Sequence, residues 1–134
     1  MAETFSSLRI NPDRMLDSFT QLALIGATGD GGVNRPTFSE AHLVAREWLK
    51  GEIERSGLEF RNDGAGNHSA FLLCAGQQAS TLLLGSHLDS VPNGGRFDGA
   101  LGVMAALEVL KTVKENGVRL KVNLEAIDFT DEEG

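Results

Sequence analysis

Residues 81–99 of this 134-residue chain read TLLLGSHLDSVPNGGRFDG. The stretch begins with an apolar run that is typical of a buried strand, and the apolar segment 99–116 that follows it is typical of a helix. Between them lies a loop rich in glycine, serine and asparagine, which carries His87, Asp89 and Asp98. A histidine and two aspartates at the end of a strand indicate metal-ligand chemistry. This loop is therefore the centre from which the rest of the chain is interpreted.

A second strand is predicted at 118–129, where apolar and polar residues alternate before the segment becomes apolar on both sides. With the strand at 81–86 and the helix between them, it forms a crossover unit, and such units have parallel strands in nearly all cases. Parallel strands end at the same edge of the sheet, where ligands bind in open α/β sheets. We therefore expect the acidic residues 131–133 to lie beside His87 at that edge.

Two helices and a hairpin are predicted before this unit. Each helix begins at a capping residue and ends at a glycine, from Asn11 to Gly26 and from Ser39 to Gly57. The patterns at 58–61 and 69–75, separated by turn residues, predict a hairpin. The strand at 81–86 is apolar on both faces and should lie mid-sheet, between layers of helices. The expected fold is a three-layer α/β fold with a mixed, mostly parallel sheet flanked by helices.

Bulk composition excludes several classes of function. The net charge of −7 argues against nucleic acid or an anionic membrane as a partner, since both repel an acidic surface. No segment resembles a signal peptide or the roughly 20 apolar residues of a membrane span. The single cysteine, Cys74, fits a reducing compartment and is interpreted as a buried apolar side chain. We expect one cytoplasmic domain that binds neither nucleic acid nor membrane.

Two further histidines and a glycine-rich segment are predicted not to form metal or nucleotide sites. His42 is predicted to be solvated or at the edge of the core, and His68 to be structural, because neither has a partner nearby in the sequence. The glycine-rich segment 26–32 follows a helix and lacks the lysine of a phosphate-binding loop. It is interpreted as a loop near the substrate, with a plain connector as the alternative.

Convergence at the sheet edge brings His87 together with up to five carboxylates. Such a cluster repels itself unless a proton or a cation is present, and one or two divalent cations of the Zn²⁺ or Mn²⁺ type would resolve the conflict. Asp89 is placed to orient the His87 ring, and Asp98 has two oxygens with which to bridge two ions. Of Glu132 and Glu133, one is expected to bind metal and the other to act as general base on a coordinated water. The alternative is that these acids are ordinary loop and cap residues.

The quoted motifs carry a family resemblance. Residues 85–91 (GSHLDSV), 94–99 (GGRFDG) and 131–134 (DEEG) resemble the M20 family of co-catalytic metallohydrolases. The short gap from His87 to Asp98 resembles its amidohydrolase branch, which contains N-carbamoyl-L-amino acid hydrolases, allantoate amidohydrolases and β-ureidopropionases. The segments Gly26-Ala27-Thr28 and Asp63-x-x-Gly66-Asn67 are similar to that branch as well.

The resemblance implies a role for each residue of the cluster. His87 would bind one divalent ion, Asp98 would bridge two, and Glu133 would bind the second. Glu132 would be the general base, and Asp89 would orient His87. The ions would be Zn, Mn, Co or Ni, and the reaction would be hydrolysis of a linear C–N amide in an N-carbamoyl-L-amino acid or related ureido substrate.

Members of that family are much longer, with further histidine ligands and a lid and dimerisation domain downstream. We therefore expect residues 1–134 to be the N-terminal part of one zinc-peptidase-like catalytic domain, truncated and without the lid. On that interpretation the chain alone binds one ion weakly or none and is nearly inactive. We also expect self-association through an exposed sheet edge at 118–129.

Two alternative functions stay open. An aminopeptidase of the related M28 type shares a His-x-Asp motif and a Glu-Glu pair, and it would act on a substrate with a free amino terminus. A non-catalytic α/β interaction module that retains the motif is the other, and it would bind no metal.

Overall fold

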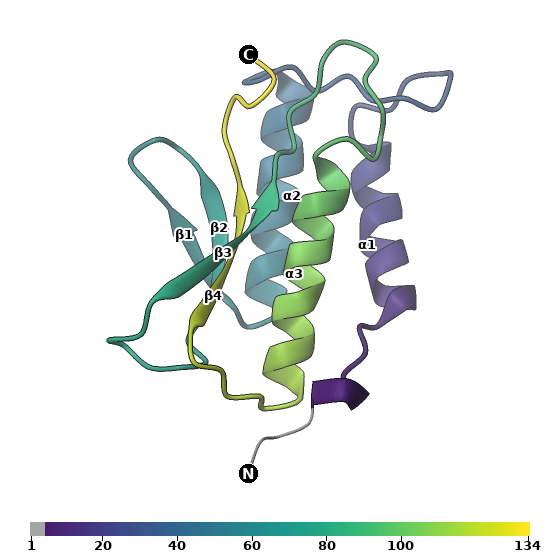
Figure 1. The fold of residues 1–134 in the computed structure, drawn as a ribbon. Coiled ribbons are helices and arrows are strands. Elements are labelled where there is room, and N and C mark those ends of the chain that lie inside the picture. The colour runs from purple at the N-terminus through teal and green to yellow at the C-terminus, as the bar shows by residue number, and fades with distance from the viewer. Residues whose placement is uncertain (1–4) are drawn as a thin grey trace.

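The computed structural model describes residues 5–134. A short 3-10 helix, η1 (Phe5–Ser7), is followed by two α-helices, a hairpin and a strand–helix–strand unit (Figure 1). In chain order these elements are α1 (Pro12–Leu24), α2 (Glu40–Arg55), β1 (Glu59–Asn62), β2 (His68–Leu72), β3 (Thr81–Ser86), α3 (Ala100–Glu115) and β4 (Asn123–Asp128). No helix within residues 5–134 is long and apolar enough to cross a membrane.

The predicted helix starts are confirmed by their caps. The Asn11 side chain accepts a hydrogen bond from the backbone N–H of Arg14 at 3.0 Å, and Ser39 Oγ accepts one from His42 at 3.2 Å. Each bond satisfies one backbone donor that the first turn of a helix leaves unpaired. Gly57, two residues after the end of α2, has a φ of +64°, as expected for a left-handed C-terminal residue.

The sheet is mixed and has the strand order β1-β2-β4-β3. β3 pairs with β4 in parallel, as the crossover predicts, with Ser86 opposite Asp128. The hairpin β1–β2 is also confirmed, and β2 pairs with β4 in the antiparallel sense. The predicted α/β class with a mixed, helix-flanked sheet is therefore confirmed. Parallel pairing is less prominent than predicted, because the hairpin docks against β4 and contributes antiparallel pairs.

The position of β3 within the sheet differs from the prediction. β3 is an edge strand and not a central one, and Leu82 and Leu83 are 49% and 46% exposed. β4, which was expected to have the free edge, lies between β2 and β3. β4 begins only at Asn123, because the preceding segment bends away and the Leu120 N–H donates to the carbonyl of Cys74. Figure 1 shows the three long helices gathered on one side of the sheet, whereas helices on both faces were predicted.

The hydrophobic core lies between the sheet and these helices. Its fully or almost fully buried members include Leu22 of α1, Leu49 and Ile53 of α2, and Leu107 and Leu110 of α3. Burying one such side chain stabilises the fold by about 1.5–3 kcal/mol. Cys74 is also buried among them, which confirms its interpretation as a small apolar side chain.

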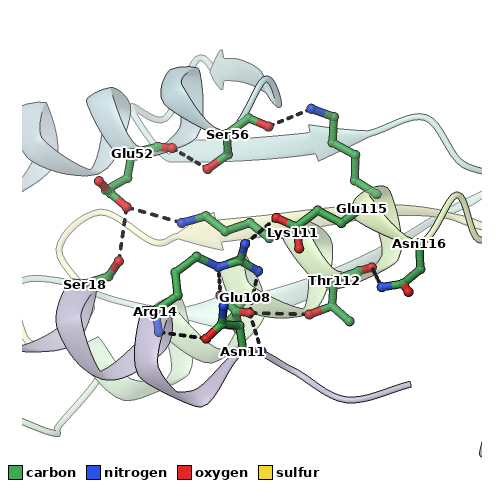
Figure 2. A network of polar contacts seen from close by, with 11 residues as sticks. Asn11, Arg14, Ser18, Glu52, Ser56, Glu108, Lys111, Thr112, Glu115 and Asn116 are labelled. Carbon is green, nitrogen blue, oxygen red and sulfur yellow. Dashed lines mark hydrogen bonds and ion pairs between the residues drawn. The ribbon is translucent and has the colours of Figure 1, made fainter. Parts of the chain in front are cut away.

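A network of polar contacts fixes α1 and α2 against α3 (Figure 2). Glu108 of α3 is buried and accepts two hydrogen bonds from the Arg14 guanidinium, at 2.7 and 2.9 Å. On the neighbouring turn, Lys111 donates to Glu52 of α2 at 3.3 Å. Burial alone would raise the pKa of Glu108, but the hydrogen bonds from Arg14 and from the Asn11 N–H lower it below its usual value. The network therefore holds charged groups in ionised, paired form between the helices.

Candidate metal centre

Three loops meet at the carboxyl ends of β3 and β4. They are residues 25–39 before α2, residues 87–99 between β3 and α3, and the C-terminal residues 129–134, and Figure 1 shows them together at one end of the molecule. The sequence predicted that His87 and the acidic pair Glu132-Glu133 would meet here. The structure places them at this edge.

The His87 ring is the centre of the cluster. It is buried, and its Nε2 lies 3.4 Å from Oε2 of Glu132 and 3.7 Å from Oδ1 of Asp98. One ligand atom each of His87, Glu132 and Glu133 can be chosen so that all lie within 4.8 Å of one another. The spacing fits a single cation held by one imidazole and two carboxylates. The tightest group thus contains Glu132 in place of Asp98, whereas the sequence assigned metal binding to His87, Asp98 and Glu133.

The other ring nitrogen of His87 faces Asp89. Nδ1 is 2.9 Å from the backbone carbonyl oxygen of Asp89 and 3.5 Å from its Oδ1. Because a carbonyl can only accept, the ring proton belongs on Nδ1, and the lone pair of Nε2 points toward Glu132 and Asp98. This is the tautomer that a metal ligand needs. Asp89 therefore lies within reach of Nδ1 of the ring, and its role in orienting His87 stays a prediction.

Asp89 also ties the loops together. Its Oδ2 accepts hydrogen bonds from the Glu133 N–H at 3.0 Å and from the Thr37 hydroxyl at 3.1 Å. Burial would raise the pKa of the Asp89 carboxyl, but these two donors and the neighbouring His87 lower it below its usual value. One buried carboxylate thus connects the ring of His87, the backbone of Glu133 and the loop before α2.

Two buried polar side chains, Asp128 and Arg35, fix the backbone of Leu88 between His87 and Asp89. Oδ1 of Asp128 accepts the N–H of Leu88 at 2.8 Å, and Nε of Arg35 donates to the Leu88 carbonyl at 2.9 Å. Asp128 and Arg35 are both fully buried. Burial raises the pKa of Asp128 to about 7, although Nε of Arg46 lies 3.3 Å from its Oδ2. These contacts fix the backbone on both sides of Leu88.

Two glycines let the loop pass close to its neighbours. A Cβ on Gly99, which has a φ of +66°, would lie 2.4 Å from the carbonyl oxygen of His87 and 2.5 Å from the ring carbon Cε1. A Cβ on Gly85 would lie 2.0 Å from the carbonyl oxygen of Ile127. No side chain fits at either position without moving His87 or β4.

Sequence reasoning missed several residues of this edge. His42 was predicted to be solvated or at the core edge, but it is fully buried, and its Nδ1 accepts the Phe38 N–H at 2.9 Å. Arg35 lies in the loop before α2 and is fully buried, and nothing in its sequence neighbourhood indicates a buried guanidinium. Asp128 could have been found, because it is a lone carboxylate within the apolar end of β4. His68 is structural, as predicted, with its ring edge-on to Phe60 at 5.1 Å between centroids.

Buried polar atoms without a hydrogen bond gather in the same region, although two of them, Nε of Arg46 and Oδ2 of Asp128, form an ion pair at 3.3 Å. Within residues 5–134, the buried side-chain atoms without a hydrogen-bond partner are Nε2 of His42, Nε of Arg46, Nδ1 of His68, Oδ1 of Asp89 and Oδ2 of Asp128. All belong to residues that line or support this edge of the sheet. Buried polar groups in folded proteins are normally paired, so this concentration marks the edge as specialised.

Comparison with known proteins adds independent observations. Residues 72–134 match the model described as Peptidase family M28. The chain is 38% identical to an N-carbamoyl-L-amino acid amidohydrolase of Geobacillus stearothermophilus, over 93% of this chain and 31% of that protein. It is 40% identical to an allantoate amidohydrolase of Bacillus subtilis, over 88% of this chain and 29% of that protein.

A solved structure agrees with these relatives. The crystal structure of a hydantoinase/carbamoylase family amidase from Burkholderia ambifaria superimposes with a TM-score of 0.90 at 38% identity, covering 95% of this chain and 31% of that chain. The chain therefore spans about a third of the length of the proteins that it matches. The M20 name that the motifs suggested stays a prediction.

Proposed function

We propose that this chain contributes the metal-binding edge of an amidohydrolase, the class named for its relatives from Geobacillus stearothermophilus and Bacillus subtilis, an N-carbamoyl-L-amino acid amidohydrolase and an allantoate amidohydrolase. The proposed reaction is hydrolysis of a linear C–N amide in an N-carbamoyl-L-amino acid or a related ureido compound. Since the relatives are about three times as long, the substrate and the activity are proposed for the whole protein of this kind.

The residues at the edge fit a divalent cation. His87 offers a lone pair on Nε2, and Glu133 and Asp98 offer carboxylate oxygens, with two ions of the Zn, Mn, Co or Ni type as the proposed complement. When bound, such ions would lower the pKa of a coordinated water to about 7 and offset the negative charge that develops on the amide oxygen. Without a cation, the carboxylates around His87 would repel one another.

Glu132 would transfer the proton during the reaction, and Asp89 would fix the tautomer of His87. Glu132 is more than half exposed, and its Oε2 lies 3.4 Å from His87 Nε2, so its carboxylate is placed to accept a proton from the attacking water. It would then return that proton to the nitrogen that leaves as the C–N bond breaks. Asp89 would keep the His87 proton on Nδ1 throughout. The observation that carries the proposal is this ring, with one nitrogen fixed by Asp89 and the other facing two carboxylates.

The first experiment measures metal binding by the 134-residue chain. Calorimetric titration with Zn²⁺, and absorption spectra with Co²⁺, are expected to give binding that His87→Ala weakens beyond the roughly 10–100-fold typical of losing an outer-shell partner. Glu54→Gln, an exposed change on α2, is the matched control and should bind like the wild type. Binding that His87→Ala leaves unchanged would contradict the proposal, and absence of binding both in the chain and in a full-length chimera with the Geobacillus stearothermophilus amidohydrolase would favour the non-catalytic interaction module.

The second experiment measures chemistry. Residues 1–134 would replace the matching segment of the Geobacillus stearothermophilus amidohydrolase, and hydrolysis of N-carbamoyl-L-leucine would be followed by ammonia release. Glu132→Gln in this chimera is expected to lower kcat by about 10²–10⁴-fold while metal binding persists. Glu54→Gln should leave kcat unchanged.

An aminopeptidase of the M28 type is the second candidate. The match of residues 72–134 to that family model favours it, since His87, Asp98 and the glutamate pair all lie within the match. The longer relatives at 38% and 40% identity favour the amidohydrolase. A panel that includes leucine p-nitroanilide, which has a free amino group, separates the two. Cleavage of that compound by the 134-residue chain itself, with no cleavage of N-carbamoyl-L-leucine, would support the aminopeptidase.

A further inference from the structure

A cavity of about 290 Å³ opens directly beside the glutamate pair. Its walls come from the same three loops that form the metal-binding edge: residues 36–38, residues 90–92, and the C-terminal residues Asp131, Glu133 and Gly134. Glu133 belongs to both the ligand cluster and the cavity wall. A molecule held at His87 could therefore extend into this cavity.

Backbone strain is concentrated in the cavity wall. Among residues 5–134, the non-glycine residues with positive φ are Phe38 at +60°, Asn93 at +53° and Asp131 at +62°. Phe38 and Asp131 both line this cavity. A bulky side chain in the left-handed region is rare, and such strained residues cluster at ligand-binding and active sites. The fold thus holds Phe38 in a left-handed backbone conformation, which is sterically unfavourable for a residue with a bulky side chain.

Hydrogen bonds connect Phe38 and its neighbour Thr37 to buried groups of the metal-binding edge. The Phe38 N–H donates to Nδ1 of His42, which is fully buried, at 2.9 Å. The neighbouring Thr37 donates its hydroxyl proton to Oδ2 of Asp89 at 3.1 Å. Asp89 in turn faces the ring of His87. The position of Phe38 is therefore set relative to the metal ligands by two short connections.

The cavity wall has an apolar side and an acidic side. Phe38 is 64% exposed and Val91 is 44% exposed, although both are large apolar residues, and Pro36 and Pro92 flank them. Covering these surfaces with another apolar group removes them from water and favours binding. Asp131 and Glu133 on the other side would repel a second carboxylate. The lining fits an uncharged hydrocarbon group and disfavours an acidic one.

We propose that this cavity binds the apolar side chain of the amino-acid substrate, and that Phe38 determines the preference for such side chains. The inference rests on the proposed function, because it takes the reacting amide to lie at His87. Aliphatic and aromatic side chains are preferred over the hydrogen of glycine and over the carboxylate of aspartate. Phe38 contacts the side chain of the substrate and takes no part in the bond-breaking step.

The test compares three ligands on the Zn²⁺-loaded 134-residue chain. N-carbamoyl-L-leucine is expected to bind about tenfold or more tighter than N-carbamoylglycine, and N-carbamoyl-L-aspartate weakest, as measured by calorimetry. Phe38→Ala should bring the leucine-to-glycine ratio close to one while the affinities for N-carbamoylglycine and for Zn²⁺ stay as in the wild type. Phe38→Leu should restore most of the ratio. Leu73→Ala, an exposed change at the opposite end of β2, is the matched control.

A wild-type ratio of one, or a ratio that Phe38→Ala leaves unchanged, would overturn the proposal. Failure of the proposed function is recognised separately, as absence of Zn²⁺ binding by the wild-type chain and by the chimera. In that case the same three compounds are titrated into the metal-free chain, and the NMR shifts of the Val91 methyl groups are followed. Saturable shifts with the leucine compound that Phe38→Ala abolishes would support the cavity, and no shifts with any compound would refute it.

Discussion

The two groups of buried charges in this molecule differ in how completely they are paired. Between the helices, Glu108 is buried against Arg14 and has a hydrogen-bond partner for each carboxylate oxygen (Figure 2). At the sheet edge, Asp128 is also buried, but its Oδ2 has only an ion-pair contact with Nε of Arg46 at 3.3 Å, and Oδ1 of Asp89 lies 3.5 Å from Nδ1 of His87. Short hydrogen bonds to both oxygens stabilise the helix packing, whereas the longer contacts beneath the ligand cluster indicate that function constrains the edge.

The pKa values of the two carboxyls reflect this difference. Burial pushes both upward, but two hydrogen bonds from Arg14 reverse the effect at Glu108, whose pKa is lowered. At Asp128 burial prevails over Arg46 and the Leu88 N–H, and the pKa rises to about 7. Burial weighs more heavily on Asp128 than on Glu108, and Glu108 also has two close hydrogen bonds from Arg14, so the two pKa values shift in opposite directions.

The largest expected effect concerns Asp128 and pH. Its folded pKa of about 7 exceeds the ordinary value of 3.8, so the folded state holds the extra proton and stability falls as pH rises from about 4 to about 7. Asp128→Asn keeps an acceptor for Leu88 and removes the titration. The difference in unfolding free energy, variant minus wild type, should increase by about 4 kcal/mol between pH 4 and pH 8.

Urea unfolding of the metal-free chain at several pH values measures that change. Asp63→Asn is the control, because hydrogen bonds from Asn67 lower the pKa of Asp63 and the pH trend should have the opposite sign. A variant-minus-wild-type difference that is constant with pH would mean that Asp128 stays ionised beside Arg46. The two buried clusters would then be electrostatically alike.

The next largest effect is expected between the helices. Glu108→Leu leaves Arg14 without its buried partner and should lower the unfolding free energy by about 3 kcal/mol, since breaking one side of a buried pair is costly. Metal affinity at the sheet edge should not change. Glu115→Gln, which alters the exposed partner of Arg14, should cost less than about 1 kcal/mol. Equal losses from both variants would show that burial of Glu108 adds nothing to the pair.

The smallest effect separates strain from packing at Phe38. Phe38→Gly removes an exposed ring and relieves a left-handed backbone, so the unfolding free energy should rise by about 1 kcal/mol. Phe38→Ala keeps the strain and should be close to the wild type in stability. Thermal unfolding of both variants measures this. A loss of stability in Phe38→Gly would mean that the ring serves the fold and that the edge is not strained for function.

The sequence predicted this edge through chain order. The caps at Asn11 and Ser39, the crossover from β3 to β4 and the placement of His87 near Glu132 follow from local patterns and the handedness of crossovers. Those patterns depend on neighbours in the sequence, and each signal lies within one element or one connection.

The missed features depend on contacts between distant segments. A run of three leucines is consistent with a central strand, and only the docking of the hairpin on β4 leaves β3 at the edge. Arg35 is buried where it meets the Leu88 carbonyl, 53 positions away. Thr37, which precedes the strained Phe38, donates to Asp89, 52 positions away. No local pattern could have indicated any of these.

The close packing of Gly99 against His87 makes the first turn of α3 sensitive to a ligand bound at His87. Its missing Cβ lets the backbone that starts α3 lie against the ring and the carbonyl of His87, and the Val103 N–H donates to the Gly99 carbonyl at 3.2 Å. A ligand that immobilises His87 must therefore slow the opening of the first turn of α3. Deuterium uptake at the Val103 amide would read out the state of the loop without any label or substitution at the site.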